Sequence, residues 1–104
     1  MSYIRELQDA IRRLHGVESE HVGSVPVIET YQGRTIWDGV VEVFDLKEHP
    51  SAFRVYAWAH ETDNAAHPRR HVTVLHQHPI KSAHDAVRIA IAQELKNLGT
   101  AEES

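Results

Sequence analysis

The segment FRVYAWAHE, residues 53–61, decides the fold because its alternating residues are apolar on both sides. As a β-strand it presents Phe53, Val55, Ala57 and Ala59 on one face, and Tyr56 and Trp58 on the other. An ordinary antiparallel strand buries one face and turns polar side chains to solvent on the other. Each face of this strand therefore needs a cover of its own.

Length and composition describe one small globular domain. The chain has 104 residues, 41% of them hydrophobic and 25% charged, which suffices for a single core without covalent staples. It has no cysteine, so disulfides, thiolate nucleophiles and cysteine-ligated metals are excluded. No apolar run approaches the roughly 20 residues of a membrane span, and the first residues lack a signal-peptide pattern. A cytoplasmic location and no membrane partner are expected.

The charge balance argues against a nucleic-acid partner, and histidine is unusually frequent. The formal net charge is −4, whereas nucleic-acid-binding proteins usually carry a basic patch. The nine histidines nearly equal the eleven lysines and arginines taken together. Because free histidine titrates near about pH 6.5, mild acidification would reverse the sign of this surface.

Periodicity divides the chain into six elements. An amphipathic pattern over residues 3–15, between Ser2 as cap and Gly16 as stop, predicts a first helix. Alternating segments predict four strands, over residues 22–31, 34–46, 53–61 and 70–78. A capping-box pattern predicts a second helix over residues 82–98, and residues 100–104 are expected to form a disordered acidic tail.

Residues 1–99 are therefore expected to form one α+β domain of order α-β-β-β-β-α. We expect a two-layer sandwich in which a four-stranded antiparallel meander carries both helices on one face. Symmetric hairpins would give that face Val25, Val27, Ile36, Val40, Phe44, Leu46, Phe53, Val55, Ala57, Ala59, Val72 and Val74. The opposite face would hold Ile28, Trp37, Val41, Val43, Tyr56, Trp58 and Leu75, with His60 and His71 at its rim. One bulge would reverse the faces of a strand.

The opposite, aromatic face would be too large an apolar patch for a soluble monomer to leave bare. Three covers are open: a second copy packed about a two-fold axis, a ligand or peptide, or a helix that crosses over. We expect a homodimer. The expected interface or ligand-binding residues are Trp37, Tyr56, Trp58, Val41, Val43 and Leu75.

Metal and acid–base chemistry have weaker support. His76 and His78 would share one side of a strand, and the expected register sets His60 opposite His71, so either pair could supply two metal ligands. A specific site needs three or four converging ligands, and no cofactor is expected. Three strand carboxylates, Glu29, Asp38 and Glu42, would point toward the helices, where ion pairs are the ordinary outcome. No nucleophile elbow, P-loop or dinucleotide fingerprint is present.

Three segments together resemble a group of small bacterial proteins of unknown function: VGSVPV (22–27), YQGRTIWDGVVEVFDL (31–46) and YAWAH (56–60). The resemblance covers the expected sheet and implies a bacterial cytosolic protein, with no activity and no site residues attached. From the residues themselves we expect a non-enzymatic interaction module that dimerises through its aromatic sheet face. The alternative is a small-molecule or metal-binding protein, or an enzyme, that uses this face and nearby histidines as a pocket.

Overall fold

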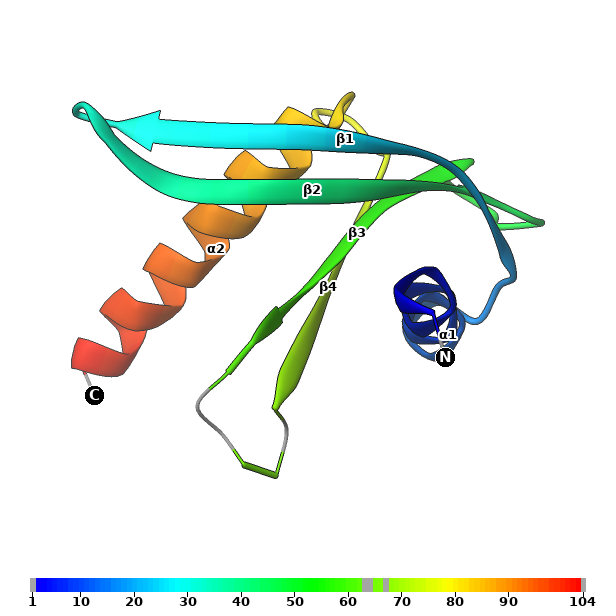
Figure 1. Ribbon diagram of the computed structural model, residues 1–104, viewed down its shortest axis with the longest axis horizontal. Helices are drawn as coiled ribbons and strands as arrows, with labels where there is room; N and C mark the ends of the chain where they lie inside the picture. The colour runs from blue at the N-terminus through cyan, green and yellow to red at the C-terminus, as the bar shows by residue number, and fades with distance from the viewer. Residues whose placement is uncertain (1, 63–64, 67, 104) are drawn as a thin grey trace.

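The computed structural model describes residues 2–62, 65–66 and 68–103, with side chains as far as Glu94. Its order of elements confirms the predicted α-β-β-β-β-α meander (Figure 1). The elements are α1 (Tyr3–His15), β1 (Ser19–Tyr31), β2 (Arg34–Leu46), β3 (Arg54–Glu61), β4 (Arg69–Leu75) and α2 (Ala83–Glu103). Within the described chain, no helix is both long enough and apolar enough to cross a membrane.

α1 begins and ends where its capping residues predict. The Arg5 backbone amide donates to the Ser2 hydroxyl over 3.1 Å, and Gly16 closes the helix in the left-handed region at φ 72°. The Gly16 amide donates to the Arg12 carbonyl over 2.8 Å, which satisfies one of the free carbonyls at the helix end. The buried side of α1 carries Leu7, Ala10 and Ile11.

The sheet consists of two hairpins that separate from each other. β1 and β2 form a long hairpin whose turn residues, Gln32 and Gly33, both have positive φ, as a type I′ turn requires. β3 and β4 pair along their whole length. Between the hairpins, residues Glu42–Asp45 of β2 pair with residues Arg54–Ala57 of β3, and the rest of these two strands is not paired to each other. Beyond these pairs the hairpins diverge, as Figure 1 shows.

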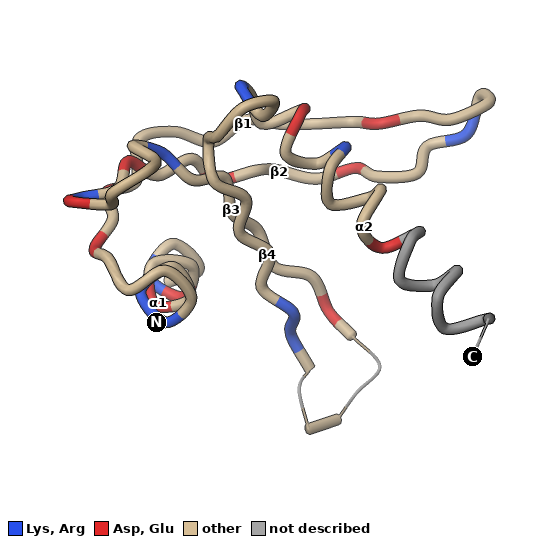
Figure 2. Tube along the Cα trace, turned by 180° about the vertical axis from the view of Figure 1, so that it is seen from behind, with Lys and Arg blue, Asp and Glu red and all other residues tan. Residues whose placement is uncertain are grey.

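The two helices lie on opposite faces of the sheet, in the two angles that the diverging hairpins form (Figure 1). α1 packs on Phe44, Val55 and Ala57. α2 packs on the other face, and the buried core there comprises Val27, Val41, Val43, Tyr56, Trp58, Ala83, Ala86 and Val87. The α+β meander with terminal helices is as expected, but the placement of both helices on one face is wrong (Figure 1 and Figure 2). Divergence of the hairpins gives each face room for one helix.

Two one-residue shifts explain which side chains change faces. Val22 is an extra residue between the pairs His21–Phe44 and Gly23–Val43, so the following residues of β1 are reversed relative to simple alternation. In β4 the register is one residue from the expected one, because His71 pairs with Ala59 and not with His60. A one-residue slip exchanges the faces of a strand. Val25, Val27, Val72 and Val74 consequently belong to the α2 side, whereas Leu75 belongs to the α1 side.

α2 begins as predicted but continues farther. The Asp85 amide donates to the Ser82 hydroxyl over 3.2 Å, and the Asp85 carboxylate accepts from the Lys81 amide over 3.0 Å. The helix extends to Glu103, whereas the sequence predicts an end near Leu98 and a disordered tail after it. Gly99 costs a helix only about 1 kcal/mol relative to alanine and does not by itself end one. Ser104 lies outside the described residues.

Candidate functional site

The sheet has two outer edges, β1 and β4, and they differ in how well they are protected. β1 contains Pro26 and two register irregularities, both of which oppose pairing with a further strand. β4 contains no proline and keeps one continuous register against β3. β4 therefore offers the better edge for a partner strand.

The backbone groups that β4 turns outward can be identified from the hydrogen bonds at its two ends. The His76 amide donates to the Arg54 carbonyl over 2.9 Å, and the Thr62 amide donates to the Pro68 carbonyl over 2.8 Å. Antiparallel strands exchange hydrogen bonds at alternate residues, so the even-numbered residues of β4 bond to β3. The amides and carbonyls of Arg69, His71 and Thr73 consequently point away from the sheet.

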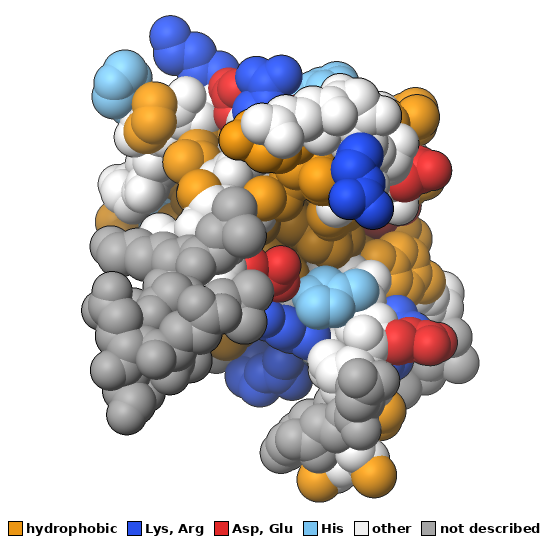
Figure 3. Space-filling model, turned by 90° about the vertical axis from the view of Figure 1, so that its left-hand side faces the viewer, with side chains coloured by type: hydrophobic (Ala, Val, Ile, Leu, Met, Phe, Trp, Pro, Cys, Tyr) orange, Lys and Arg blue, Asp and Glu red, His pale blue; other side chains and the backbone are white. Residues whose placement is uncertain are grey.

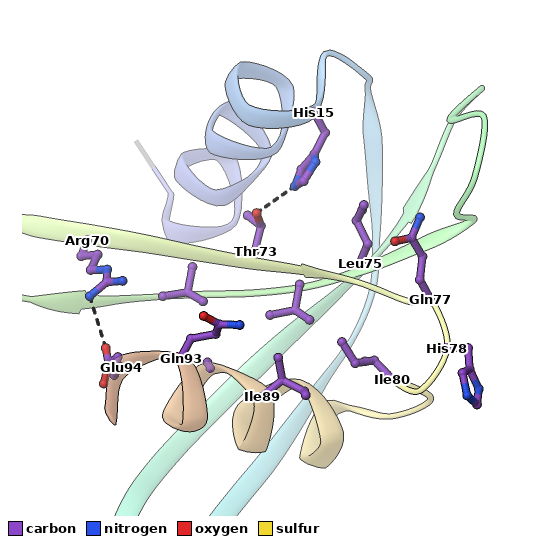
Figure 4. Close-up of a pocket in the computed structure, with 13 residues that line it drawn as sticks. His15, Arg70, Thr73, Leu75, Gln77, His78, Ile80, Ile89, Gln93 and Glu94 are labelled. Atoms are coloured by element: carbon purple, nitrogen blue, oxygen red, sulfur yellow. Dashed lines mark hydrogen bonds and ion pairs between the residues drawn. The ribbon is translucent and has the colours of Figure 1, made fainter. Parts of the chain in front are cut away.

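A hollow of about 420 Å³ follows this edge, between β4 and α2 (Figure 4). Its apolar lining consists of Val72, Val74, Leu75, Ile80, Ile89 and Ala90. Its polar lining consists of His15, Arg70, Thr73, Gln77, His78, Gln93 and Glu94. An apolar groove beside a free strand edge is the arrangement that strand-adding partners occupy.

Two polar contacts hold the rim of the hollow in place (Figure 4). His15, at the end of α1, is hydrogen-bonded through Nε2 to the Thr73 hydroxyl over 2.8 Å. Arg70 donates to the Glu94 carboxylate over 3.3 Å and so ties β4 to α2. Burial lowers the pKa of the His15 imidazole below its usual 6.5, and the nearby His49 lowers it further. His15 therefore stays neutral at the mouth of the hollow at neutral pH.

Two smaller hollows, of about 210 and 280 Å³, lie where β2 and β3 separate. Both are lined by Trp37, Trp58 and His60. The first opens toward α2 and the second toward the start of α1. They lie on the two faces of one opening between the hairpins.

The aromatic residues predicted to form an open face belong mostly to the core. Tyr56 and Trp58 are each 4% exposed because α2 covers them, and Val41 and Val43 are buried with them. Of the three covers left open for this face, the helix that crosses over is therefore the one that the structure shows. Trp37 is only half-buried, with its indole edge-on to Trp58 at a centroid distance of 5.5 Å.

Of the six predicted interface residues, Leu75 alone lines the hollow beside β4, while it also packs on the α1 side. The residues that sequence reasoning missed are mainly on α2. Ile89 and Gln93 line this hollow, and Ile89 lies outside the buried stripe of α2 that packs on the sheet, which consists of Ala83, Ala86, Val87, Ala90 and Ile91. An exposed isoleucine off the buried stripe is the signal that would have identified this face of α2.

His60 and His71, one of the two expected histidine pairs, each contact an acidic residue of a different helix. His60 pairs with Arg70 in the ladder and lies 3.8 Å from Glu94 of α2, whereas His71 bonds to Glu6 of α1 over 2.7 Å. His60 and His71 thus point to opposite faces, because the register of β4 differs by one residue from the expected one. In the described part of the chain, no three histidine or acidic side chains converge as a metal site would need.

His76 and His78 lie outside β4, which ends at Leu75, so they do not share the side of a strand. His76 is hydrogen-bonded through Nδ1 to the Tyr56 hydroxyl over 2.7 Å, and its ring packs on Phe53. His78 lies in the turn before α2, at the rim of the hollow beside β4. The two imidazoles therefore have separate surroundings.

Two of the three strand carboxylates, Glu42 and Glu29, form structural contacts. Glu42 is 6% exposed, accepts a hydrogen bond from the Ser24 hydroxyl, and bonds to His21 Nε2 over 2.9 Å. Both partners share one carboxylate oxygen, and among the described residues no hydrogen bond joins Ser24 to His21. A nucleophile–base pair is therefore not assembled there. Glu29 instead accepts from Arg88 of α2 over 3.0 Å.

No protein-family model, curated protein or solved structure matches this chain.

Proposed function

We propose that this protein is a non-enzymatic interaction module that forms a homodimer by pairing β4 with the same strand of a second copy. The observation that carries the proposal is the contrast between the two sheet edges. β1 contains Pro26 and two register irregularities, whereas β4 is regular and lies beside an apolar hollow. This surface replaces the aromatic sheet face, which α2 covers.

Two-fold symmetry suits β4 because an antiparallel pair of identical strands is self-complementary. Pairing centred on Thr73 uses the outward amides and carbonyls on both sides of that residue. On the α2 side it sets Val72 of one copy opposite Val74 of the other. Such cross-strand pairs of β-branched residues each stabilise a sheet by about 0.2–1 kcal/mol.

The hollow supplies apolar contact beyond the hydrogen bonds. Ile89 of α2 is 36% exposed and lines the hollow above β4, so a second copy of the strand would cover its side chain. Full burial of an isoleucine contributes about 1.5–3 kcal/mol, so covering the 36% of Ile89 that is exposed contributes about a third of that amount, and two-fold symmetry counts the residue twice. Replacement of Ile89 is therefore the best test of whether the dimer forms through β4.

Sedimentation velocity over a range of concentrations tests the proposal with two matched variants. Ile89→Glu introduces a carboxylate into the hollow and should give a folded monomer. Ile28→Glu makes the same change at a 61% exposed isoleucine on β1 and should leave the dimer intact. A wild-type protein that sediments as a monomer at every concentration would overturn the proposal. Dissociation by Ile28→Glu with an intact Ile89→Glu dimer would also overturn it.

Hydrogen exchange supplies a second readout at the strand itself. The outward amides of His71 and Thr73 exchange quickly in a monomer because no strand covers them. In the proposed dimer their exchange slows as the protein concentration rises, whereas Val72 and Val74 are protected at every concentration. Exchange at His71 and Thr73 that does not depend on concentration contradicts pairing through β4.

A further inference from the structure

The two hairpins separate beyond the pair Glu42–Ala57, toward Trp37 on β2 and His60 on β3. The opening between them is here called the notch. Past that pair the facing edges of β2 and β3 have no strand between them. The Tyr3 hydroxyl accepts a hydrogen bond from the Ala59 amide over 2.9 Å, so α1 satisfies a backbone donor that β2 has left. The sheet is thus held open and its free backbone is partly satisfied.

The notch is hollow on both faces. The two hollows share Trp37, Trp58 and His60, and their sizes suit a ligand of few atoms more than a drug-sized one. Figure 3 shows this side of the molecule, with hydrophobic side chains at the floor and acidic, basic and histidine side chains around them. A small ligand with one apolar side and one polar group fits such surroundings.

The Trp37 indole is fixed at the wall of the notch. It lies edge-on to the buried Trp58, with 73° between the ring planes, and it also lies over Gly39. A Cβ at Gly39 would stand 3.0 Å from Trp37 Cη2, closer than real Cβ atoms usually approach a neighbour. With a side chain at position 39 the ring would have to move by a few tenths of an ångström. The platform therefore exists before any ligand arrives.

The charges around the notch favour a cation. Asp38 lines the hollow near α1, is exposed, and forms no hydrogen bond or ion pair with another described residue. Glu94 lines the other hollow and is shared by Arg70 at 3.3 Å and His60 at 3.8 Å. Asp38 and Glu94 together carry two negative charges against the single positive charge of Arg70. A cation over an indole face is also attracted by the ring quadrupole.

We infer that the notch binds a small organic cation, with the Trp37 indole as its platform and the Asp38 carboxylate as its counter-charge. The ligand class is a planar or alkyl group that bears an amidinium or ammonium. The indole contacts its apolar part, and Asp38 accepts hydrogen bonds from its charged nitrogen atoms. Charge-assisted hydrogen bonds to a carboxylate are stronger than neutral ones, so charge and not shape selects the ligand.

Three probes of nearly the same shape test this inference: benzamidine, benzamide and benzoate, which are cationic, neutral and anionic at neutral pH. The chain has only two tryptophans, and both line the notch, so the two indole N–H resonances in an NMR titration report on it directly. We expect the titration of the Trp37 resonance to give a dissociation constant about tenfold lower for benzamidine than for benzamide. Benzoate should not shift this resonance. No shift with benzamidine, or equal shifts with all three probes, would overturn the inference.

Two variants separate the counter-charge from the platform. Asp38→Asn removes a charge from an exposed residue and should remove most of the preference for benzamidine over benzamide. Gly39→Ala displaces the indole and should weaken both probes. Gly23→Ala is the matched control, since a Cβ there meets no atom within 4 Å. If the Asp38→Asn protein keeps the full preference for benzamidine, Asp38 is not the counter-charge. If the Gly39→Ala protein binds the probes as tightly as the Gly23→Ala protein, the indole is not the platform. Circular dichroism establishes that each variant is folded.

Discussion

Replacement of Trp58 by arginine tests directly whether this residue belongs to the core or to an exposed face. Trp58 lies on β3 under α2, and only 4% of it is exposed. If α2 covers this face of the sheet, the arginine at position 58 must place a guanidinium among apolar side chains. If the face were open instead, the charge would remain in water and the fold would tolerate it.

The structure sets the size of the effect. Truncation of a buried tryptophan costs about 3–5 kcal/mol, and an unpaired buried charge adds to this cost. A domain of this kind has a total free energy of unfolding of about 5–15 kcal/mol. With a urea slope of about 1.5 kcal/mol/M, Trp58→Ala should lower the unfolding midpoint by roughly 2–3 M. Trp58→Arg should be mostly unfolded before urea is added.

Urea unfolding followed by far-ultraviolet circular dichroism measures this without relying on the tryptophan that is removed. Ile28→Arg is the matched control, because Ile28 is 61% exposed on β1 and its replacement should change stability by no more than about 0.5 kcal/mol. A Trp58→Arg protein that unfolds at the same urea concentration as Ile28→Arg would refute the cover by α2. It would also return the aromatic face to the list of candidate interfaces.

Two further predictions concern pH. Burial raises the pKa of Glu6, but hydrogen bonds from Arg69 and His71 outweigh it, and the net pKa lies below the usual 4.5. Glu6 thus stabilises the fold above about pH 4.5, and this contribution is lost as the pH falls through the lowered value. Glu6→Gln should lower the free energy of unfolding by about 0.5–1.5 kcal/mol at neutral pH and make it depend less on pH in the acid range. An unchanged dependence in the acid range would contradict the assignment. Burial and His49 lower the pKa of His15, so its contribution is present above pH 6.5 and is lost as the pH falls toward the lowered value. His15→Gln should therefore reduce the difference in urea midpoint between about pH 7.5 and about pH 5.5, and the same difference as in wild type would argue against a neutral His15.

Local signals in the sequence predict the elements of this fold well. Ser2 and Gly16 set the ends of α1, and Ser82 sets the start of α2, because caps act within a few residues of the chain. The Gln32–Gly33 turn predicts the long hairpin, and alternation within 53–61 correctly separates the two faces of β3. Each of these signals depends only on neighbouring residues.

Long-range register could not be predicted in the same way. The extra residue at Val22 and the one-residue offset of β4 leave no mark on apolar periodicity, yet each reverses the faces of a strand. The position of α2 depends on how far the hairpins diverge, which is decided by the short β2–β3 pairing. The hollow beside β4 was missed for this reason, since it exists only once α2 lies on the face opposite α1.

The narrow junction between β2 and β3 has a consequence for how the molecule holds its shape. Only a short ladder of hydrogen bonds joins one hairpin to the other, so this ladder cannot by itself set the angle between them. Each helix contacts both hairpins: α1 reaches β1, β3 and β4, and α2 reaches β1, β2 and β4. Each helix thus fills one of the two angles between the hairpins (Figure 1). Because the two angles lie side by side, closing the hairpins around one helix would widen the angle that holds the other. A molecule that binds on one side of the junction would thereby alter the space available on the opposite side.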